Sequence, residues 1–254
     1  MFSGGAGSWA AAKRLAESYG TDGLVLLFAD TLIEDEDNYR FLDQAAENVG
    51  GTFVRLTEGR DPWQVFFDER FLGNTRADPC SRVLKRSVLR GWVEQNCDPL
   101  STVVYLGIDW SEVHRFERAK PHWEPWQLGA PLCDRPYLDK RDALAWLRSE
   151  GIEPPRLYAA GFQHANCGGF CVKAGQAHFA NLLRFDRKRY LYHEEREQQL
   201  RAYLDADVAI LRDRTGGATK PMTLRAFRER VEAQGSFDAD EWGGCSCLLA
   251  AGPT

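Results

Sequence analysis

Short apolar runs separated by helical patterns constrain the fold of this chain most strongly. Leu24–Ala29 is a continuous apolar run that ends at Asp30 and Thr31. Such a run is typical of a strand buried on both faces of a parallel sheet. Further strand patterns lie at Thr52–Leu56 and Thr102–Leu106, with stretches typical of helices between them. The alternation predicts an α/β fold with a parallel, doubly wound sheet.

A glycine-rich loop precedes the first run. Residues 3–8 read Ser-Gly-Gly-Ala-Gly-Ser and lead into an alanine-rich helical pattern from Trp9 to Tyr19. Glycine lets backbone N–H groups turn inward, and the start of a helix attracts anions, so the loop predicts a phosphate cradle. The alternative is an N-terminal cap without a site. Because only Met1 and Phe2 precede the loop, we expect the strand that usually leads into such a cradle to be missing from the sheet.

The composition predicts a globular protein without a membrane partner. The 254 residues suffice for one large α/β domain, or for a domain with an appended lobe. The net charge of -5 gives no general attraction for nucleic-acid backbones, so a nucleic-acid substrate is possible but not indicated. The chain shows no signal-peptide pattern and no apolar run near the roughly 18 residues of a membrane span, which favours the cytoplasm.

The character of the chain changes after Gly129, where prolines punctuate the sequence between predicted helices. We therefore expect a nucleotide-binding α/β domain at residues 1–130. Residues 131–254 would form an α-rich extension that carries a cluster of four cysteines, packed either separately or as one unit with the first domain.

Two cysteine pairs in this extension are flanked by paired glycines. Their members are Cys167, Cys171, Cys245 and Cys247. Four thiolates could hold a [4Fe–4S] cluster, which we favour, or Zn²⁺. A third possibility is thiol-based sulfur chemistry in which one pair resolves the other. The remaining alternative is a set of buried, inert cysteines.

Five elements within residues 1–180 occur in an order that resembles one superfamily. The elements are the loop Ser3–Ser8, the run Phe28–Thr31 with Tyr39 and Phe41 behind it, Cys80 and Lys85 in a C-x-x-x-x-K spacing, Gly107-Ile108 with Glu112 and Arg115, and Leu157-Tyr158 with Gly161-Phe162 before Cys167 and Cys171. They resemble motifs of the adenine-nucleotide α-hydrolases, the group of phosphoadenosine phosphosulfate (PAPS) reductases and PP-loop ATP pyrophosphatases.

The chain departs from these motifs in three places. Gly7 stands where the loop usually carries Asp, the spacing from Cys167 to Cys171 exceeds CxxC by one, and the tail Cys245-Ser246-Cys247 is not the E-C-G-L-H tail of the assimilatory reductases.

The resemblance implies a Rossmann-like sheet of that type and a site for ATP with Mg²⁺. The nucleotide-binding residues would be Ser3, Gly4, Gly5, Gly7, Ser8, Asp30 and Thr31. Asp30 and Thr31 also end a predicted strand, where α/β sheets bind ligands, although capping of the next helix is an equal alternative for this pair.

Cys80, Lys85 and Arg115 are the candidate catalytic residues. Lys85 and Arg115 would neutralise phosphate charge, or else both are ordinary solvated helix charges. Cys80, near the start of a predicted helix, would have a lowered thiol pKa and attack an activated group.

Together these features predict an enzyme that adenylates an acceptor and releases pyrophosphate in a sulfur-transfer or nucleobase-modification reaction. Its partners would be an adenine nucleotide and a sulfur donor or thioredoxin-like reductant. One alternative is a thiol-dependent reductase of adenylyl sulfate or PAPS. An alternative of another class is a non-catalytic nucleotide-binding module.

Overall fold

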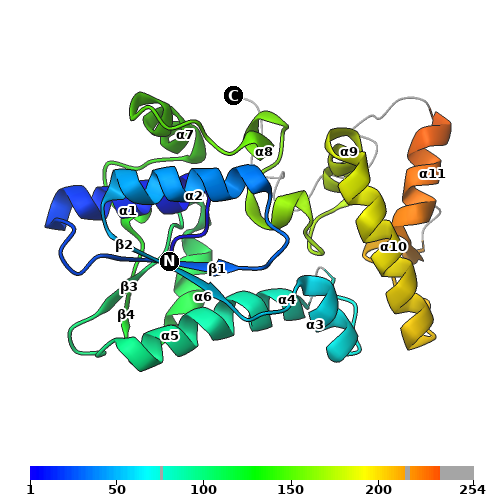
Figure 1. The fold of residues 1–254 in the computed structure, drawn as a ribbon, viewed down its shortest axis with the longest axis horizontal. Coiled ribbons are helices and arrows are strands. Elements are labelled where there is room, and N and C mark those ends of the chain that lie inside the picture. Colours follow the sequence, from blue (N-terminus) through cyan, green and yellow to red (C-terminus); the bar gives the residue numbers. More distant parts are fainter. Residues whose placement is uncertain (75–76, 215–217, 235–254) are drawn as a thin grey trace.

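Two pairs of parallel strands lie between layers of helices (Figure 1). The computed structural model describes residues 1–74, 77–214 and 218–234. β1 pairs with β2 and β3 with β4 in parallel, whereas β5 and β6 form an antiparallel hairpin. The strands are β1 (Val25–Asp30), β2 (Thr52–Thr57), β3 (Val103–Tyr105), β4 (Gln127–Gly129), β5 (Leu211–Asp213) and β6 (Lys220–Met222).

Helices cover both sides of these strands. Figure 1 shows α1 and α2 on one side of β1 and β2, α5 on the other, and α7 beyond α1. The helices are α1 (Ala6–Tyr19), α2 (Glu36–Val49), α3 (Pro62–Asp68), α4 (Pro79–Ser81), α5 (Val88–Asn96), α6 (Val113–Trp123), α7 (Lys140–Ser149), α8 (Arg156–Ala159), α9 (Gln176–Phe185), α10 (Arg187–Leu204) and α11 (Leu224–Gln234). The structure is thus a mixed α/β fold. No helix among the described residues has the length and apolar character that a membrane crossing needs.

The expected single doubly wound sheet is not confirmed, because each sheet in the described part of the chain has two strands. The backbone of the first two residues lies between the two parallel pairs. The N–H of Phe2 donates to the carbonyl oxygen of Leu27 in β1 at 2.7 Å, and the amino group of Met1 donates to that of Tyr105 in β3 at 2.7 Å. These two hydrogen bonds connect β1 to β3 without a ladder of strand residues.

Two large apolar clusters organise the molecule. One joins α1, α2, β1 and α7 around the fully buried Trp9 and Phe41. The other joins α3, α9, α10 and α11 around Trp63, Phe179 and Phe227. Because α7 belongs to the first cluster, part of the segment after residue 130 packs against α1. The predicted domain boundary at that residue stays a prediction.

Helices α9, α10 and α11 group at the right of Figure 1, as an α-rich C-terminal lobe. The buried carboxylate of Glu197 in α10 accepts hydrogen bonds from the N–H of Ile210 (2.9 Å) and of Leu224 (2.6 Å). It thereby joins α10 to the β5–β6 hairpin and to the start of α11. Burial raises the pKa of Glu197 to about 7, which is the electrostatic cost of placing a carboxyl group in this core.

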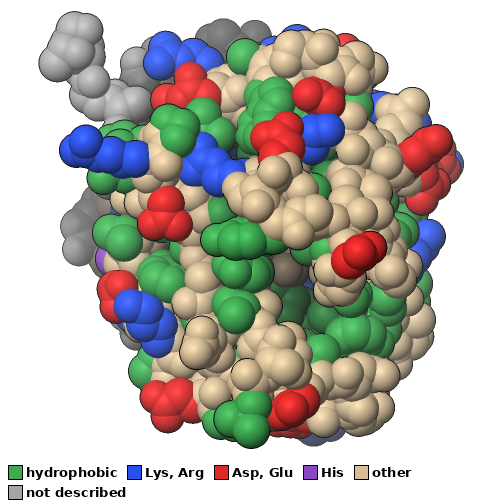
Figure 2. All heavy atoms as spheres, turned by 90° about the vertical axis from the view of Figure 1, so that its left-hand side faces the viewer, with side chains coloured by type: hydrophobic (Ala, Val, Ile, Leu, Met, Phe, Trp, Pro, Cys, Tyr) green, Lys and Arg blue, Asp and Glu red, His purple; other side chains and the backbone are tan. Residues whose placement is uncertain are grey.

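On the face of the molecule shown in Figure 2, acidic and basic side chains are interspersed. This distribution agrees with the small negative net charge of -5. A mixed surface of this kind gives no strong field for the backbone of a nucleic acid. On this face, recognition of a charged ligand would therefore need a local site.

Gly107 makes a close backbone contact with the start of α1. A Cβ atom on Gly107 would lie 2.6 Å from Cα of Ser8 and 3.1 Å from the carbonyl carbon of Gly7. Backbone atoms at the start of α1 cannot move away as a flexible side chain could. Only glycine therefore fits where the chain leaves β3 and passes the glycine-rich loop.

We predict that Gly107→Ala lowers the free energy of unfolding by about 1–3 kcal/mol, because the added methyl group overpacks this backbone contact. Gly91→Ala is the matched control, since a Cβ there, in the middle of α5, meets nothing within 4 Å. It should stabilise by roughly 0.5–1 kcal/mol through helix propensity. Urea-induced unfolding followed by circular dichroism measures both, and equal effects would contradict the packing argument.

Candidate functional site

The glycine-rich loop turns three backbone N–H groups toward hydroxyl oxygens. The hydroxyl oxygen of Ser8 accepts hydrogen bonds from the N–H of Ser3 (3.1 Å) and of Gly5 (3.3 Å). The N–H of Ala6 donates to the phenol oxygen of Tyr158 at 3.2 Å. These donors, at the start of a 14-residue helix, have the chemistry that phosphate oxygens require. Ser8 lies inside the first turn, and Gly5 occupies the N-cap position of α1.

Gly7 faces the segment that follows β3. A Cβ on Gly7 would lie 3.3 Å from the carbonyl oxygen of Gly107. A carboxylate at this position would extend from a crowded point beside that oxygen. Gly7 stands where the resembling loops carry Asp. It therefore allows the start of α1 to pack closely against the segment after β3.

Asn38 and Glu34 connect the loop to the interior. A Cβ on Gly4 would lie 2.8 Å from the side-chain nitrogen of Asn38, so Asn38 directly contacts the loop backbone. That nitrogen donates to Oε2 of Glu34 at 3.4 Å. The side-chain oxygen of Asn38 is buried and has no hydrogen-bond partner in the part of the chain that the structure describes. A buried, unpaired acceptor beside the loop is a position where a ligand donor would be stabilised.

Cys167 lies at the other end of this connection. Its backbone N–H donates to Oε2 of Glu34 at 2.5 Å, and its Sγ lies 3.5 Å from Nζ of Lys85. The hydroxyl oxygen of Thr31 is 2.9 Å from Oε1 of Glu34 and 3.8 Å from Sγ of Cys167. Cys167 has φ 55°, a left-handed conformation that is strained for a residue with a Cβ. Strain held by buried contacts is common where a side chain must be presented for function.

Burial and ion pairing set the protonation of these groups. Burial raises the pKa of the Cys167 thiol to about 11, and the Lys85 cation opposes this rise. Burial also raises the pKa of Glu34, again against the effect of Lys85. Burial works against the charge of Lys85, but Cys167 and Glu34 outweigh it and raise the pKa of this ammonium group. Lys85 therefore stays charged and is the cation that would stabilise a thiolate on Cys167.

Cys80 and Cys171 belong to the same region as Cys167. Lys173 forms an ion pair with Asp78 at 3.5 Å, and Cys80 and Cys171 pack against the same apolar cluster, so their two segments lie side by side. The predicted lowering of the Cys80 pKa is wrong. Burial raises the pKa of this thiol to about 12, and negative charge on Cys167 and Cys171 would raise it further. Cys80 lies in the three-residue α4, and desolvation outweighs whatever a helix start contributes.

The two residues at the end of β1 make contacts within the protein. Asp30 is 1% exposed and accepts hydrogen bonds from the Tyr39 hydroxyl (3.0 Å) and from Nε of Arg55 (2.9 Å). Thr31 instead contacts the Cys167 network. The alternative that this pair caps the next helix is wrong, because the side chain of Asp35 caps α2. A magnesium ion at Asp30 would have to displace an existing ion pair.

His164 lies beside His178, with ring centroids 5.7 Å apart. Burial lowers the pKa of His164 to about 4, and the charges of His178, Lys85, Lys140 and Arg115 lower it further. Its Nδ1 atom is buried and has no hydrogen-bond partner among the described residues. Cations from the starts of α6 and α7 thus act on the same region as Lys85. Such a convergence favours an anionic ligand.

Arg115 differs from the other two candidate catalytic residues in its environment. It lies on the exposed α6, where its Nη1 is 2.5 Å from Oε1 of Glu112. An exposed ion pair of this kind holds a side chain weakly, with roughly 0–1 kcal/mol. Lys85 and Cys80 lie inside the molecule beside Cys167, whereas Arg115 could reach a ligand only by reorienting.

The four predicted metal ligands cannot be brought together here, because Cys245 and Cys247 lie outside the described residues. Within the described ranges, no group of three or more His, Cys, Asp or Glu side chains is arranged to hold a metal ion. Cys80, Cys167 and Cys171 supply soft sulfur donors, yet their placement is not that of a ligand set for a [4Fe–4S] cluster or Zn²⁺. Metal binding by the four-cysteine set stays a prediction.

Sequence reasoning did not identify Glu34 and Asn38. An acid before a helix is usual for electrostatic reasons alone, so Glu34 gave no distinct signal. Glu34 precedes the N-cap of α2 and Asn38 lies in its first turn, so an acid and an amide four residues apart across a helix start are the signal that could have identified them. Tyr158 stood in the predicted Leu-Tyr motif without a role of its own.

No protein-family model matches the chain. No curated protein matches its sequence either.

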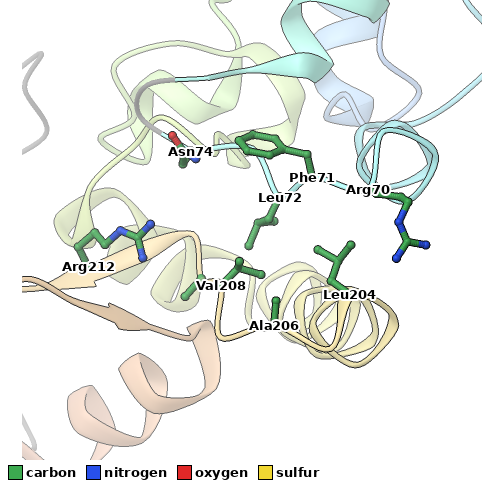
Figure 3. A pocket seen from close by; sticks show the side chains of 9 residues that line it. Arg70, Phe71, Leu72, Asn74, Leu204, Ala206, Val208 and Arg212 are labelled. Atoms are coloured by element: carbon green, nitrogen blue, oxygen red, sulfur yellow. The ribbon is translucent and has the colours of Figure 1, made fainter.

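A separate cavity of about 440 Å³ lies between the α3–α4 connection and the α10–β5 connection (Figure 3). Its walls are mostly apolar, with Leu72, Leu204 and Val208 pointing inward and Arg212 extending along one side (Figure 3). None of its lining residues contributes to the loop or to the Cys167 network. The cavity is therefore not part of the candidate site.

We predict that Lys85→Met raises the pKa of Cys167, because the variant lacks the cation 3.5 Å from the sulfur. At a fixed alkaline pH, alkylation of Cys167 by iodoacetamide should slow roughly tenfold for each unit that the pKa rises. Mass spectrometry of the Cys167 peptide against time measures the rate. Lys173→Met, which removes a more exposed lysine near the same cysteines, is the control and should change the rate little. An unchanged rate in Lys85→Met would show that Lys85 does not stabilise the thiolate.

A second prediction concerns acid stability. Between pH 6.5 and about pH 4 the unfolded chain binds a proton at His164 that the folded chain does not, so this group lowers the free energy of unfolding as the pH falls. Over this window His164→Gln should gain stability relative to the wild type by on the order of 3 kcal/mol. Urea unfolding at each pH gives the difference, with the exposed His114→Gln as control. A difference that is constant with pH would contradict the shift.

Proposed function

We propose that this chain is an adenine-nucleotide enzyme that uses a cysteine thiol in sulfur transfer. The observation that carries the proposal is the continuous path of contacts from Gly4 through Asn38 and Glu34 to Cys167. This path joins the glycine-rich loop, which would bind the phosphates, to a thiol that has its own cation. Phosphate chemistry and thiol chemistry in one network support a reaction that needs both.

In the proposed reaction the loop binds the phosphates of ATP with Mg²⁺. An oxygen of the acceptor attacks the α-phosphorus, the bond to the β-phosphate oxygen breaks, and pyrophosphate leaves with the electron pair. The N–H groups of Ser3, Gly5 and Ala6 would exchange the hydroxyl oxygens of Ser8 and Tyr158 for phosphate oxygens and so stabilise the charge on the departing phosphates. The product is an adenylated acceptor.

Cys167 would then supply the sulfur. A persulfide on Cys167, formed by a persulfide donor, attacks the acceptor carbon, and AMP leaves with the electrons of the carbon–oxygen bond. A second thiol, from Cys80 or Cys171, attacks Sγ of Cys167 and releases the acceptor with its new sulfur. The resulting disulfide needs two electrons from a thioredoxin-like reductant. Lys85 would stabilise the negative sulfur in the first of these steps.

The finer fold assignment is part of this proposal. Parallel pairing of β1 with β2 and of β3 with β4, with α2 and α6 as connections, supports a Rossmann-like arrangement of the adenine-nucleotide α-hydrolase type. The backbone hydrogen bonds of Met1 to β3 and of Phe2 to β1 support a strand order in which these two strands lie near each other in such a sheet.

Gly4→Ala tests the loop. Its Cβ would lie 2.8 Å from Asn38 at φ 74°, so we expect the affinity for ATP with Mg²⁺ to fall roughly tenfold or more, measured by isothermal titration calorimetry. Gly23→Ala is the matched control, because it has φ 75° with no atom within 4 Å and shares only the backbone strain. A wild-type protein that does not bind ATP would refute the nucleotide site.

Cys167→Ser tests the thiol separately. It should leave ATP affinity unchanged, and it should abolish the gain of one sulfur atom at residue 167 after incubation with glutathione persulfide. Cys97→Ser is the control, and peptide mass spectrometry is the measurement. A wild-type protein that binds ATP but takes up no sulfur at Cys167 would leave a nucleotide-binding module. Sulfite release from adenylyl sulfate or PAPS would instead indicate the reductase.

A further inference from the structure

Two large aromatic side chains lie exposed beside each other near the loop. Trp110 is 50% exposed and Tyr137 is 52% exposed. Their ring centroids are 6.0 Å apart and the ring planes are tilted by 43°. Val113, 45% exposed, extends the apolar surface at the start of α6. Single exposed aromatic residues are common, but a contiguous pair beside a candidate site is typical of a binding surface.

The segment of each ring is fixed to the candidate site by named contacts. Trp110 follows Gly107, whose backbone packs on Ser8 at the start of α1. The segment of Tyr137 is held to α1, because Arg14 donates to the carbonyl oxygen of Pro136 at 2.6 Å. The same segment is joined to that of Trp110 by Cys133, whose thiol donates to the carbonyl oxygen of Ile108 at 3.5 Å.

A second path leads from Tyr137 to the loop. Lys140, three residues on, places its ammonium group 4.9 Å from the ring centre of Tyr158. The hydroxyl of Tyr158 accepts the N–H of Ala6 in the loop. The aromatic pair is thus at the rim of the anion site and does not belong to a distant face of the molecule.

A cation lies next to the aromatic pair. The guanidinium of Arg135 lies 5.8 Å from the ring centre of Tyr137. Acids lie in the same region: Glu112 pairs with Arg115, Asp139 caps α7, and the charges of Asp109 and Asp134 act on Cys133. Stacking surfaces next to cations are the usual means of holding nucleobases without reading their sequence.

We propose that Trp110 and Tyr137 form a stacking platform for a nucleobase at the rim of the phosphate loop. The proposal rests on the proposed function, because the loop would hold the phosphates while the platform holds a base. That base belongs either to the bound nucleotide itself or to an acceptor nucleotide. Both sources share the same chemistry, a flat heteroaromatic ring bearing phosphate.

Four probes separate these sources in binding experiments on the full chain. ATP with Mg²⁺ carries base and phosphates, inorganic tripolyphosphate carries phosphates alone, and adenosine carries the base alone. A fluorescein-labelled single-stranded oligonucleotide represents an acceptor. Calorimetry measures the first three, and fluorescence anisotropy measures the last.

The test variant is the double substitution Trp110→Ala with Tyr137→Ala. It should lower the affinity for ATP and adenosine, or that for the oligonucleotide, by roughly tenfold or more, while tripolyphosphate binds as before. The variant Trp110→Phe with Tyr137→Phe keeps both rings and should restore most of the affinity. Tyr19→Ala is the control, since Tyr19 is 78% exposed at the opposite end of α1 and should change nothing.

The pattern of losses decides the source and the proposal. Loss of ATP and adenosine binding assigns the platform to the base of the nucleotide, and loss of oligonucleotide binding alone assigns it to an acceptor. Unchanged binding of every probe overturns the platform, and so does a loss that includes tripolyphosphate, which would indicate damage to the loop. A wild-type protein that binds adenosine or the oligonucleotide but not tripolyphosphate would refute the phosphate loop and leave the platform standing.

Discussion

The buried carboxylate of Glu34 is the constraint on which the candidate site depends. It is 5% exposed, and a charge so placed is tolerated only with close partners. Those partners come from three parts of the chain: Thr31 and Asn38 nearby, the backbone of Cys167 far along the sequence, and the cation of Lys85. Satisfying one acid therefore brings the ends of β1, α2 and the cysteine segment to one place. The position of the thiol relative to the loop follows from this requirement.

The sequence predicted those parts of the fold whose pattern reports burial. The apolar run 24–29 corresponds closely to β1, because a strand buried on both faces must be continuously apolar. The pattern at 52–56 corresponds to β2, which is only partly buried, so its apolar residues alternate with polar ones. Helix α6 was not predicted, since none of its residues is buried and so no apolar stripe marks it. Strand β4, which follows α6 and pairs with β3, has three residues, too few to show an alternating pattern of apolar and polar residues. Pairing between strands, and hence the number of strands in each sheet, depends on tertiary contacts that no local pattern encodes.

The candidate site was predicted only in part, because some of its features depend on tertiary contacts. The loop, Gly107 and Tyr158 stood in ordered motifs, and the structure brings these segments together through the Gly107–Ser8 and Ala6–Tyr158 contacts. The sign of the Cys80 pKa shift was wrong because a helix start is visible in a sequence, whereas the burial that raises the pKa of this thiol is not. For Asp30 the strand end was correct, but the cross-strand ion pair with Arg55 could not be inferred without the register of β1 and β2.

The C-terminal lobe takes part in positioning the thiol as well as in stability. Arg189 of α10 donates to the carbonyl oxygen of Ile33 at 2.8 Å, and its guanidinium fills the space where a Cβ on Gly168 would lie. Gly168 has φ 58° and follows the strained Cys167. A side chain at residue 168 would therefore meet both backbone strain and Arg189. Ile33 packs against the same apolar cluster as α10, so Arg189 ties the segment before α2 and the backbone at Gly168 to this cluster.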